Sequence, residues 1–193
     1  MKTLYIMRHG QTLFNLLKRV QGACDSPLTE LGIEQAKCAK TYFEKENIFF
    51  DNFYCSTSER AIDTLEIVSG QAEYKRLKGL KEWDFGLYEG APEYLNPPHK
   101  PGEETYGTSF VPFGGEANTE VEERMNKTLT GIMEENSAGA NVLVVSHGGA
   151  IYNFFLKWRK TEDIRPSFSN CCILKFKYSD NQFDFVESID PCV

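Results

Sequence analysis

The chain has 193 residues, of which 41% are hydrophobic and 25% are charged, and its formal net charge is −7. This composition is typical of a globular protein and excludes the disordered and fibrous classes, and the length predicts a single domain over residues 1–193. The negative charge argues against nucleic acid and anionic membranes as partners, while the lack of a long apolar run or a signal peptide predicts a cytoplasmic protein.

The first part of the chain alternates apolar runs of strand length with helical patterns. In order, it predicts a strand at 3–7, a helix at 30–45 that follows Thr29, a strand at 49–55 and a helix within 56–68. The first strand, "TLYIM", is apolar throughout, as expected for a strand buried on both faces of a parallel sheet. Ser56 and Glu59 have the spacing of a capping box, which places Arg60 in the first turn of the second helix.

The second part of the chain begins with an irregular insert. Residues 91–115 hold five of the eight prolines and four glycines, so we expect a loop or lid inserted into the domain. After it come a predicted helix from about Thr119 to Gly139, an apolar strand at 141–145, a helix at 150–158 and an alternating hairpin at 172–187. Together these elements predict an α/β fold, a three-layer sandwich with a mainly parallel central sheet, helices on both faces and an antiparallel edge hairpin at the C-terminus.

Two histidines follow the two apolar strands. His9 and His147 would both lie at the carboxyl ends of parallel strands, where α/β proteins bind their ligands. Arg8 and Arg60 would add two guanidinium groups that match phosphate oxygens, and the N–H groups of the helix that begins at Gly148 would point at the same place. These groups predict a phosphate site. There, an imidazole whose other nitrogen donates to a carbonyl can attack phosphorus, and a nearby carboxylic acid can protonate the leaving oxygen.

Five segments stand in a fixed order between residue 3 and about residue 155. They are "LYIMRHGQTLFN", "DSPLTELGIEQA", "YCSTSERAIDT", "LKEWDFGLYEG" and "VLVVSHGGAI". Together they resemble the successive signatures of the histidine phosphatase superfamily, in its cofactor-dependent phosphoglycerate mutase-like branch. A lone R-H-G motif would be a weak signal, but five segments in the order of the family are a specific one.

The resemblance implies a role for each matching residue. His9 would be the nucleophile that becomes a phosphohistidine, and Glu82 would be the general acid, with Asp84 and Glu89 as competing candidates. The phosphate site would contain Arg8, Asn15, Gln21, Arg60 and His147, although Gln21 could instead cap a turn. The resemblance also implies a reaction without metal or cofactor, which agrees with only three histidines and with six cysteines that lack the C-x-x-C spacing. Gln11 departs from the acidic residue that often follows the R-H-G motif in the relatives.

The composition of the insert separates the candidate functions. A mutase of this branch holds a doubly anionic phosphoglycerate with basic residues of the insert, but here Lys100 is the only cation within 91–113. Three carboxylates oppose it, those of Glu93, Glu103 and Glu104. Four aromatic residues either cover a partly apolar substrate or pack the insert onto the body, namely Tyr94, Tyr106, Phe110 and Phe113. We therefore predict a phosphomonoester phosphatase for a small phosphorylated metabolite, with a mutase and a silent phospho-ligand-binding protein as alternatives.

Overall fold

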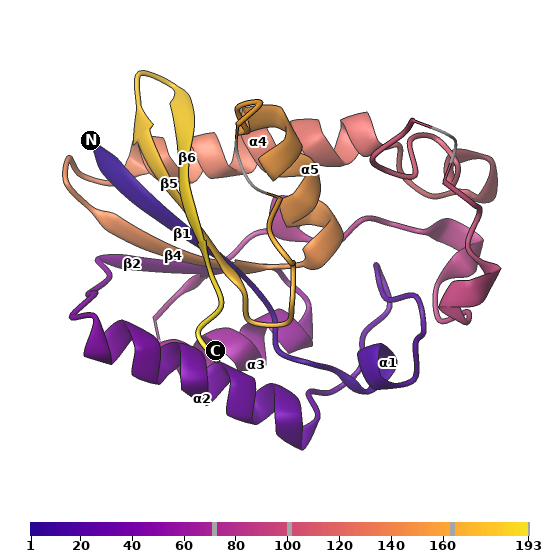
Figure 1. The fold of residues 1–193 in the computed structure, drawn as a ribbon, viewed down its shortest axis with the longest axis horizontal. Helices are drawn as coiled ribbons and strands as arrows, with labels where there is room; N and C mark the ends of the chain where they lie inside the picture. The colour runs from indigo at the N-terminus through magenta and orange to yellow at the C-terminus, as the bar shows by residue number, and fades with distance from the viewer. Residues whose placement is uncertain (71–72, 100–101, 163–164, 193) are drawn as a thin grey trace.

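The computed structural model describes residues 1–70, 73–99, 102–162 and 165–192. In this part of the chain, six strands form one sheet in the order β3-β2-β4-β1-β5-β6 (Figure 1). The strands are β1 (Lys2–Arg8), β2 (Asn52–Cys55), β3 (Lys75–Arg76), β4 (Asn141–Ser146), β5 (Ile173–Ser179) and β6 (Gln182–Ile189). Strands β1 to β4 are parallel, β5 runs antiparallel to β1, and β6 runs antiparallel to β5. The predicted mainly parallel sheet with a C-terminal antiparallel hairpin is confirmed.

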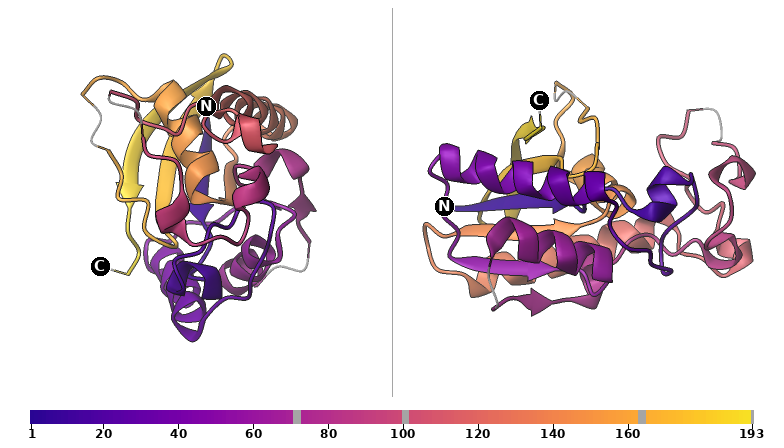
Figure 2. Two further views of the ribbon diagram at one scale, coloured as in Figure 1. Left: turned by 90° about the vertical axis from the view of Figure 1, so that its right-hand side faces the viewer. Right: turned by 90° about the horizontal axis from the view of Figure 1, so that it is seen from below.

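Helices cover both faces of this sheet, which gives the predicted three layers. Helices α2 (Glu30–Lys45) and α3 (Glu59–Ser69) lie on one face, and α4 (Asn118–Glu135) and α5 (Gly148–Trp158) on the other (Figure 1, Figure 2). Alternate side chains of β1 enter the two cores: Leu4 and Ile6 pack on the side of α4 and α5, and Tyr5 and Met7 on the side of α2 and α3. None of the helices in the described ranges is long and apolar enough to cross a membrane.

The ends of two helices test the predicted caps. Thr29 caps α2 as predicted, since its hydroxyl accepts the N–H of Gly32 at 3.1 Å, and it also donates to the side chain of Gln11 at 2.9 Å. The predicted capping box at Ser56 is wrong. Helix α3 begins at Glu59 with Ser58 as its N-cap, because the Ser56 hydroxyl instead accepts the N–H of Ser58 and closes a turn before the helix.

The described residues of the insert at 91–115 contain little regular structure, and the insert begins beside the segment that follows the short helix α1 (Leu13–Leu16). Among these residues the regular parts are two short 3₁₀ turns, η3 (Glu93–Leu95) and η4 (Val111–Phe113), and two more, η1 (Lys78–Leu80) and η2 (Gly86–Tyr88), precede the insert. The N–H of Glu93 donates to the carbonyl of Lys18 at 2.9 Å, and the N–H of Val20 donates to the carbonyl of Ala91 at 2.8 Å. These bonds fasten the start of the insert to the segment that follows α1.

The cysteines divide between core and surface. All six are free thiols, of which Cys55, Cys171 and Cys172 are buried, whereas Cys38 and Cys192 are exposed. Burial raises the pKa of Cys55 and of Cys172 to about 12, so both are uncharged thiols at neutral pH. Half of the six cysteines are therefore buried thiols.

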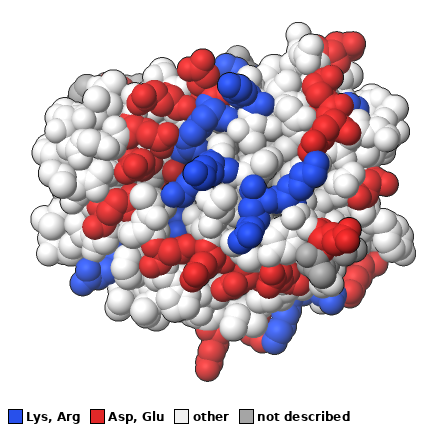
Figure 3. Space-filling model, turned by 180° about the vertical axis from the view of Figure 1, so that it is seen from behind, with Lys and Arg blue, Asp and Glu red and all other residues white. Residues whose placement is uncertain are grey.

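Charge is mixed on the side of the molecule that faces away from the viewer in Figure 1. Figure 3 shows a band of Lys and Arg side chains on this side, flanked by groups of Asp and Glu side chains. Some basic and acidic side chains of the protein form ion pairs, such as Lys75 and Glu135, whose charged atoms are 2.9 Å apart. The excess negative charge of the chain is therefore not gathered into one uniform surface on this side.

Candidate active site

Two imidazoles meet at the carboxyl edge of the parallel strands. Strands β1 and β4 are neighbours in register, with Arg8 opposite Ser146, so the residues that follow them emerge side by side. The ring centroids of His9 and His147 are 5.2 Å apart, with an angle of 63° between the ring planes. His9 is only 4% exposed, and His147 is fully buried. The structure thus brings together the two histidines that the sequence separates by more than half of the chain.

The environment of His9 fixes its protonation and its tautomer. Its Nδ1 lies 2.8 Å from the carbonyl oxygen of Gly10, and since a carbonyl can only accept, Nδ1 carries the proton and Nε2 has the free lone pair. Burial, and then the positive charges of Arg60 and Arg8, hold the pKa of His9 well below its usual value. Burial and Arg60 act in the same direction on the pKa of His147. Both rings are therefore neutral at neutral pH.

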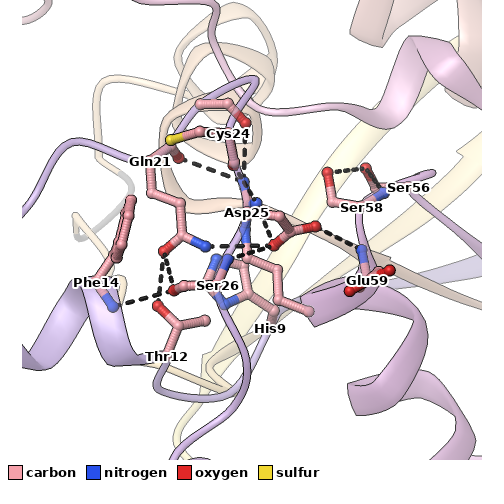
Figure 4. Close-up of polar contacts among 12 residues, drawn as sticks. His9, Thr12, Phe14, Gln21, Cys24, Asp25, Ser26, Ser56, Ser58 and Glu59 are labelled. Carbon is pink, nitrogen blue, oxygen red and sulfur yellow. Dashed lines mark hydrogen bonds and ion pairs between the residues drawn. The ribbon is translucent and has the colours of Figure 1, made fainter. Parts of the chain in front are cut away.

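Arg60 is held by an acidic partner that the sequence did not reveal. Its side chain is completely buried in the first turn of α3, and its guanidinium donates to Asp25 at 2.8 Å and to the carbonyls of Cys24 and Gly22 at 3.0 and 3.1 Å. Asp25 also accepts the N–H of Glu59 at 2.6 Å, so it bridges the guanidinium and the start of the helix (Figure 4). The Nε of Arg60 is buried and has no partner within the described residues. Arg60 thus lies in the first turn of α3, as predicted, and Asp25 orients its guanidinium.

Arg8 extends from the end of β1 toward the start of α5. Its guanidinium donates to the carbonyl of Phe168, and its Nε is buried without a partner among the described residues. A Cβ atom at Gly148 would lie 3.2 Å from this Nε, tighter than most Cβ contacts. A glycine at position 148 therefore leaves room for the Arg8 side chain.

The carboxylate of Glu82 occupies the N-terminus of α5. It accepts the N–H of Gly149 at 2.9 Å and the N–H of Ala150 at 2.7 Å, two groups that have no carbonyl partner within the helix. This corrects one expectation, because two of the helical N–H groups predicted to face a ligand instead bind Glu82. A Cβ at Gly149 would come within 2.8 Å of this carboxylate, so a larger residue at position 149 would displace the Glu82 side chain.

The two competing acidic residues have other tasks. Asp84 accepts the N–H of Gly86 at 2.8 Å, and neither Asp84 nor Glu89 lines the cavity that contains His9 and Glu82. Glu89 accepts four backbone N–H groups at 2.8 to 3.0 Å, those of Gly22, Ala23, Cys24 and Phe85. Of the three candidates, only Glu82 can therefore reach a ligand beside His9. The described residues contain no group of three His, Cys, Asp or Glu side chains that could hold a metal ion.

We expect Glu89→Gln to lower the free energy of unfolding by about 2 kcal/mol at pH 7, because hydrogen bonds to a charged acceptor are worth roughly 1.5–3 kcal/mol each and the amide keeps one oxygen. Burial alone would raise the pKa of Glu89, but hydrogen bonds from the thiol and N–H of Cys24 and from other backbone groups hold it below its usual value. The stabilisation is thus complete above the unfolded pKa of about 4.3 and is lost as the pH falls through the lower native pKa.

Urea unfolding of both proteins at pH 7 and pH 3 measures this effect. The difference in the free energy of unfolding between wild type and Glu89→Gln should shrink at the lower pH. Glu44→Gln, on the exposed side of α2, should not differ from wild type at either pH. An equal gap at both pH values would contradict the assigned role of the Glu89 charge.

Asn15 and Gln21 line the same cavity as His9, but their side-chain amides make different hydrogen bonds. The Oδ1 of Asn15 accepts the N–H of Thr12 at 3.2 Å and the Nδ2 of Asn170 at 3.3 Å. The amide of Gln21 is engaged inside its own loop, since its oxygen accepts the Thr12 hydroxyl at 2.6 Å and its nitrogen donates to Asp25 at 3.3 Å (Figure 4). Gln21 therefore has the turn-stabilising role that was the competing interpretation, and it also lines the cavity.

The cavity in front of His9 has a volume of about 630 Å³. We divide its lining by burial into an inner end, which includes the buried His9 and Gln21, and an outer wall, whose residues are exposed or half-buried. Its inner end is lined by Arg8, His9, Asn15, Gln21, Glu82 and Gly149. Its outer wall includes Lys18, Arg19, Glu93, Tyr94, Asn96 and Tyr106. Arg60, His147 and Gly148 are absent from its lining, and the first two are completely buried. A charge count restricted to the insert missed the two cations of the outer wall, which come from the segment after α1.

The four aromatic residues of the insert divide between the two predicted roles. Tyr94 and Tyr106 line the cavity. Phe110 is completely buried in the core, and Phe113 packs on the ring of Tyr88 with centroids 5.0 Å apart. Lys100, the cation on which the charge argument rested, lies outside the described residues. Two of the four side chains can thus contact a ligand, while the other two hold the insert in place.

Comparisons with known proteins place this geometry in a family. The family description "histidine phosphatase superfamily (branch 1)" matches residues 4–191. The probable phosphoglycerate mutase GpmB of Yersinia pestis is 30% identical over 190 residues, which cover 94% of this chain and 87% of the relative. The crystal structure of phosphoglycerate mutase from Bacillus anthracis aligns with a TM-score of 0.84 at 28% identity, over 97% of this chain and 92% of that one. The H9A mutant of phosphoserine phosphatase from Entamoeba histolytica, in complex with phosphoserine, aligns with a TM-score of 0.80 at 26% identity, over 99% and 98%.

Proposed function

The chain belongs to the histidine phosphatase superfamily, and we propose that it hydrolyses small phosphomonoesters through a phosphohistidine on His9, without a metal ion. One observation carries the proposal. His9 presents an unprotonated Nε2 beside the inner end of a cavity, while burial, and then the positive charges of Arg60 and Arg8, hold its pKa well below its usual value. The two guanidinium groups that add to the effect of burial would also attract a phosphate dianion.

In the first step, Nε2 of His9 attacks phosphorus and the bond between phosphorus and the ester oxygen breaks. Protonated Glu82 gives its proton to that oxygen, and the alcohol leaves. Arg8 and Asn15 line the inner end of the cavity, where they would bind the phosphoryl oxygens. Arg60, His147, Gln21 and the N–H of Gly148 would complete the phosphate site.

In the second step, water replaces the alcohol. The Glu82 carboxylate takes a proton from the water, whose oxygen attacks the phosphohistidine, and the bond between phosphorus and Nε2 breaks. Inorganic phosphate leaves, and the proton returns Glu82 to its starting form. Tyr94 and Tyr106 of the insert, on the outer wall, would cover the organic part of the substrate.

A small chromogenic phosphomonoester tests this function, assayed with and without a chelator. Hydrolysis that survives the chelator supports the metal-independent phosphatase. Tight binding of phosphate without turnover would instead indicate a silent phospho-ligand-binding protein.

A mutase remains the second candidate because of the outer wall. Lys18 and Arg19 supply two cations there, and two of the similar proteins are named phosphoglycerate mutases. Formation of an isomerised phosphoglycerate that depends strictly on a bisphosphoglycerate primer would favour this reaction over hydrolysis.

We expect the two outer cations to favour substrates with a second negative charge. The Lys18 side chain makes no ion pair with the described residues, whereas Arg19 donates to the carbonyl of Gly90 at 2.7 Å. Lys18→Gln should lower kcat/KM for 3-phosphoglycerate roughly two- to fivefold, the size of an exposed charge pair, and leave that for glycerol 3-phosphate unchanged. Lys37→Gln on α2 is the matched control. An equal loss for both substrates would contradict a role for Lys18 in binding the carboxylate.

A further inference from the structure

The segment that leads into β5 contacts three residues of the proposed site. The carbonyl of Phe168 accepts from the guanidinium of Arg8. The Nδ2 of Asn170 donates to the carbonyl of His9 at 3.1 Å and to Oδ1 of Asn15 at 3.3 Å. The N–H of Cys171 donates to the same carbonyl of His9 at 3.3 Å. A stretch of four residues, about 160 positions away in sequence, thus lies against Arg8, His9 and Asn15.

This segment has an unusual backbone. Phe168 and Cys171 have φ values of 52° and 60°, in the left-handed region that costs a residue with a side chain about 1 kcal/mol or more. Packing maintains the conformation, since the Phe168 ring lies 5.2 Å from that of Tyr152 on α5 and Cys171 is completely buried. The two strained residues flank Asn170 and present its amide to the site.

The contacts of Asn15 decide which end of its amide faces the cavity. An amide oxygen has two lone pairs, and both are used here, one by the N–H of Thr12 and one by Asn170. The Nδ2 of Asn15, which carries two hydrogens, is therefore left for a ligand in the cavity that Asn15 lines. A flipped amide would set hydrogens against two donors and direct an oxygen at a phosphate dianion, which is unfavourable on both sides.

We propose that Asn170 is a positioning residue that fixes the amide of Asn15 with its N–H groups toward the transferred phosphoryl group. The inference rests on the proposed function, because it assigns a donor to the phosphate site. Nothing in the sequence around Asn170 indicates this role, since the contact depends on the course of the chain between α5 and β5. The competing explanation is that Asn170 supports the turn only through the carbonyl of His9.

A double-mutant cycle separates these explanations. We expect Asn170→Ala to lower kcat/KM for a chromogenic phosphomonoester roughly 10- to 100-fold, with a parallel loss in affinity for inorganic phosphate. In an Asn15→Ala background, the same substitution should have an effect of less than about threefold, because its target is gone. An undiminished loss in that background would overturn the proposal.

Asn136→Ala is the matched control. The buried Asn136 amide donates to the carbonyl of Ile132 at 2.8 Å and to the hydroxyl of Tyr54 at 2.9 Å, near the opposite edge of the sheet. This variant should lower stability without changing kcat/KM or showing coupling to Asn15. Should Asn170→Ala not fold, Asn170→Ser, whose short hydroxyl cannot bridge the same two acceptors, takes its place in the cycle.

The affinity for inorganic phosphate, measured by calorimetry, keeps the two proposals distinguishable. A wild-type protein without turnover would refute the proposed function, while coupling between Asn15 and Asn170 in phosphate affinity would still support the positioning role. Turnover without coupling would refute the positioning role alone.

Discussion

His9→Ala is expected to lower turnover of a chromogenic phosphomonoester by roughly 10⁴-fold or more, because it removes the protein atom that would form the bond to phosphorus. Wild-type protein quenched during turnover should carry an acid-labile phosphoryl group on His9, detectable by mass spectrometry, and the variant should carry none. The substitution removes one hydrogen bond to Gly10 and one ring contact to His147, so the fold should persist, as circular dichroism would show.

His99→Ala is the matched control for this experiment. His99 is exposed and does not itself line the cavity, although its ring packs on that of Tyr106 with centroids 4.1 Å apart, so its removal should leave the labelling intact and change turnover far less than His9→Ala does. A phosphoryl group that persists in the His9→Ala protein, or that is found on His147 in the wild type, would contradict the assignment of the nucleophile.

The meeting of the two histidines could be predicted because strand burial leaves a local signal. Residues 4–7 and 142–145 are apolar throughout, which is typical of strands covered on both faces, and the carboxyl ends of parallel strands lie at one edge of the sheet. Because His9 and His147 each follow such a strand in the sequence, their meeting at that edge could be predicted. The structure confirms this arrangement, with a pairing register that runs from Thr3 and Asn141 to Arg8 and Ser146.

The residues that orient the site could not be predicted in the same way. Asp25 pairs with Arg60 across 35 positions, and Asn170 contacts Asn15 across 155 positions. Neither contact produces a periodic pattern, because each depends on how a loop is folded over the sheet. Lys18 and Arg19 were visible as local positive charge, but only the hydrogen bonds to residues 91–93 place them on the wall of the cavity.

The structure also shows why the acid could be confused with its neighbours. Glu82, Asp84 and Glu89 lie within eight positions, and all three carboxylates accept backbone N–H groups. They differ in which N–H groups they accept. Glu82 binds the start of α5, directly behind His147, whereas Glu89 binds residues 22–24 and Asp84 binds its own turn. Of these three residues, Glu82 alone lines the cavity, where the proposed proton transfer requires a carboxyl group.

Glu82→Gln is expected to slow esters according to their leaving groups. An alkyl ester, whose alkoxide is too basic to leave without a proton, should lose roughly 10²- to 10³-fold in kcat/KM, while a nitrophenyl ester should lose less than about fivefold. The amide keeps one acceptor for the N–H groups of Gly149 and Ala150, so the start of α5 should remain in place.

The dependence of rate on the pKa of the leaving group measures this difference across a series of phosphomonoesters. Its slope should become steeper in Glu82→Gln and stay as in the wild type in Asp84→Asn, whose side chain does not line the cavity. A variant that merely disturbed the pocket would lose the same factor with every ester, because distortion acts on the common phosphoryl group. If the plot of rate against leaving-group pKa were only displaced in parallel, Glu82 would have a structural role at the start of α5. A change in the slope of this plot would instead indicate proton transfer by Glu82.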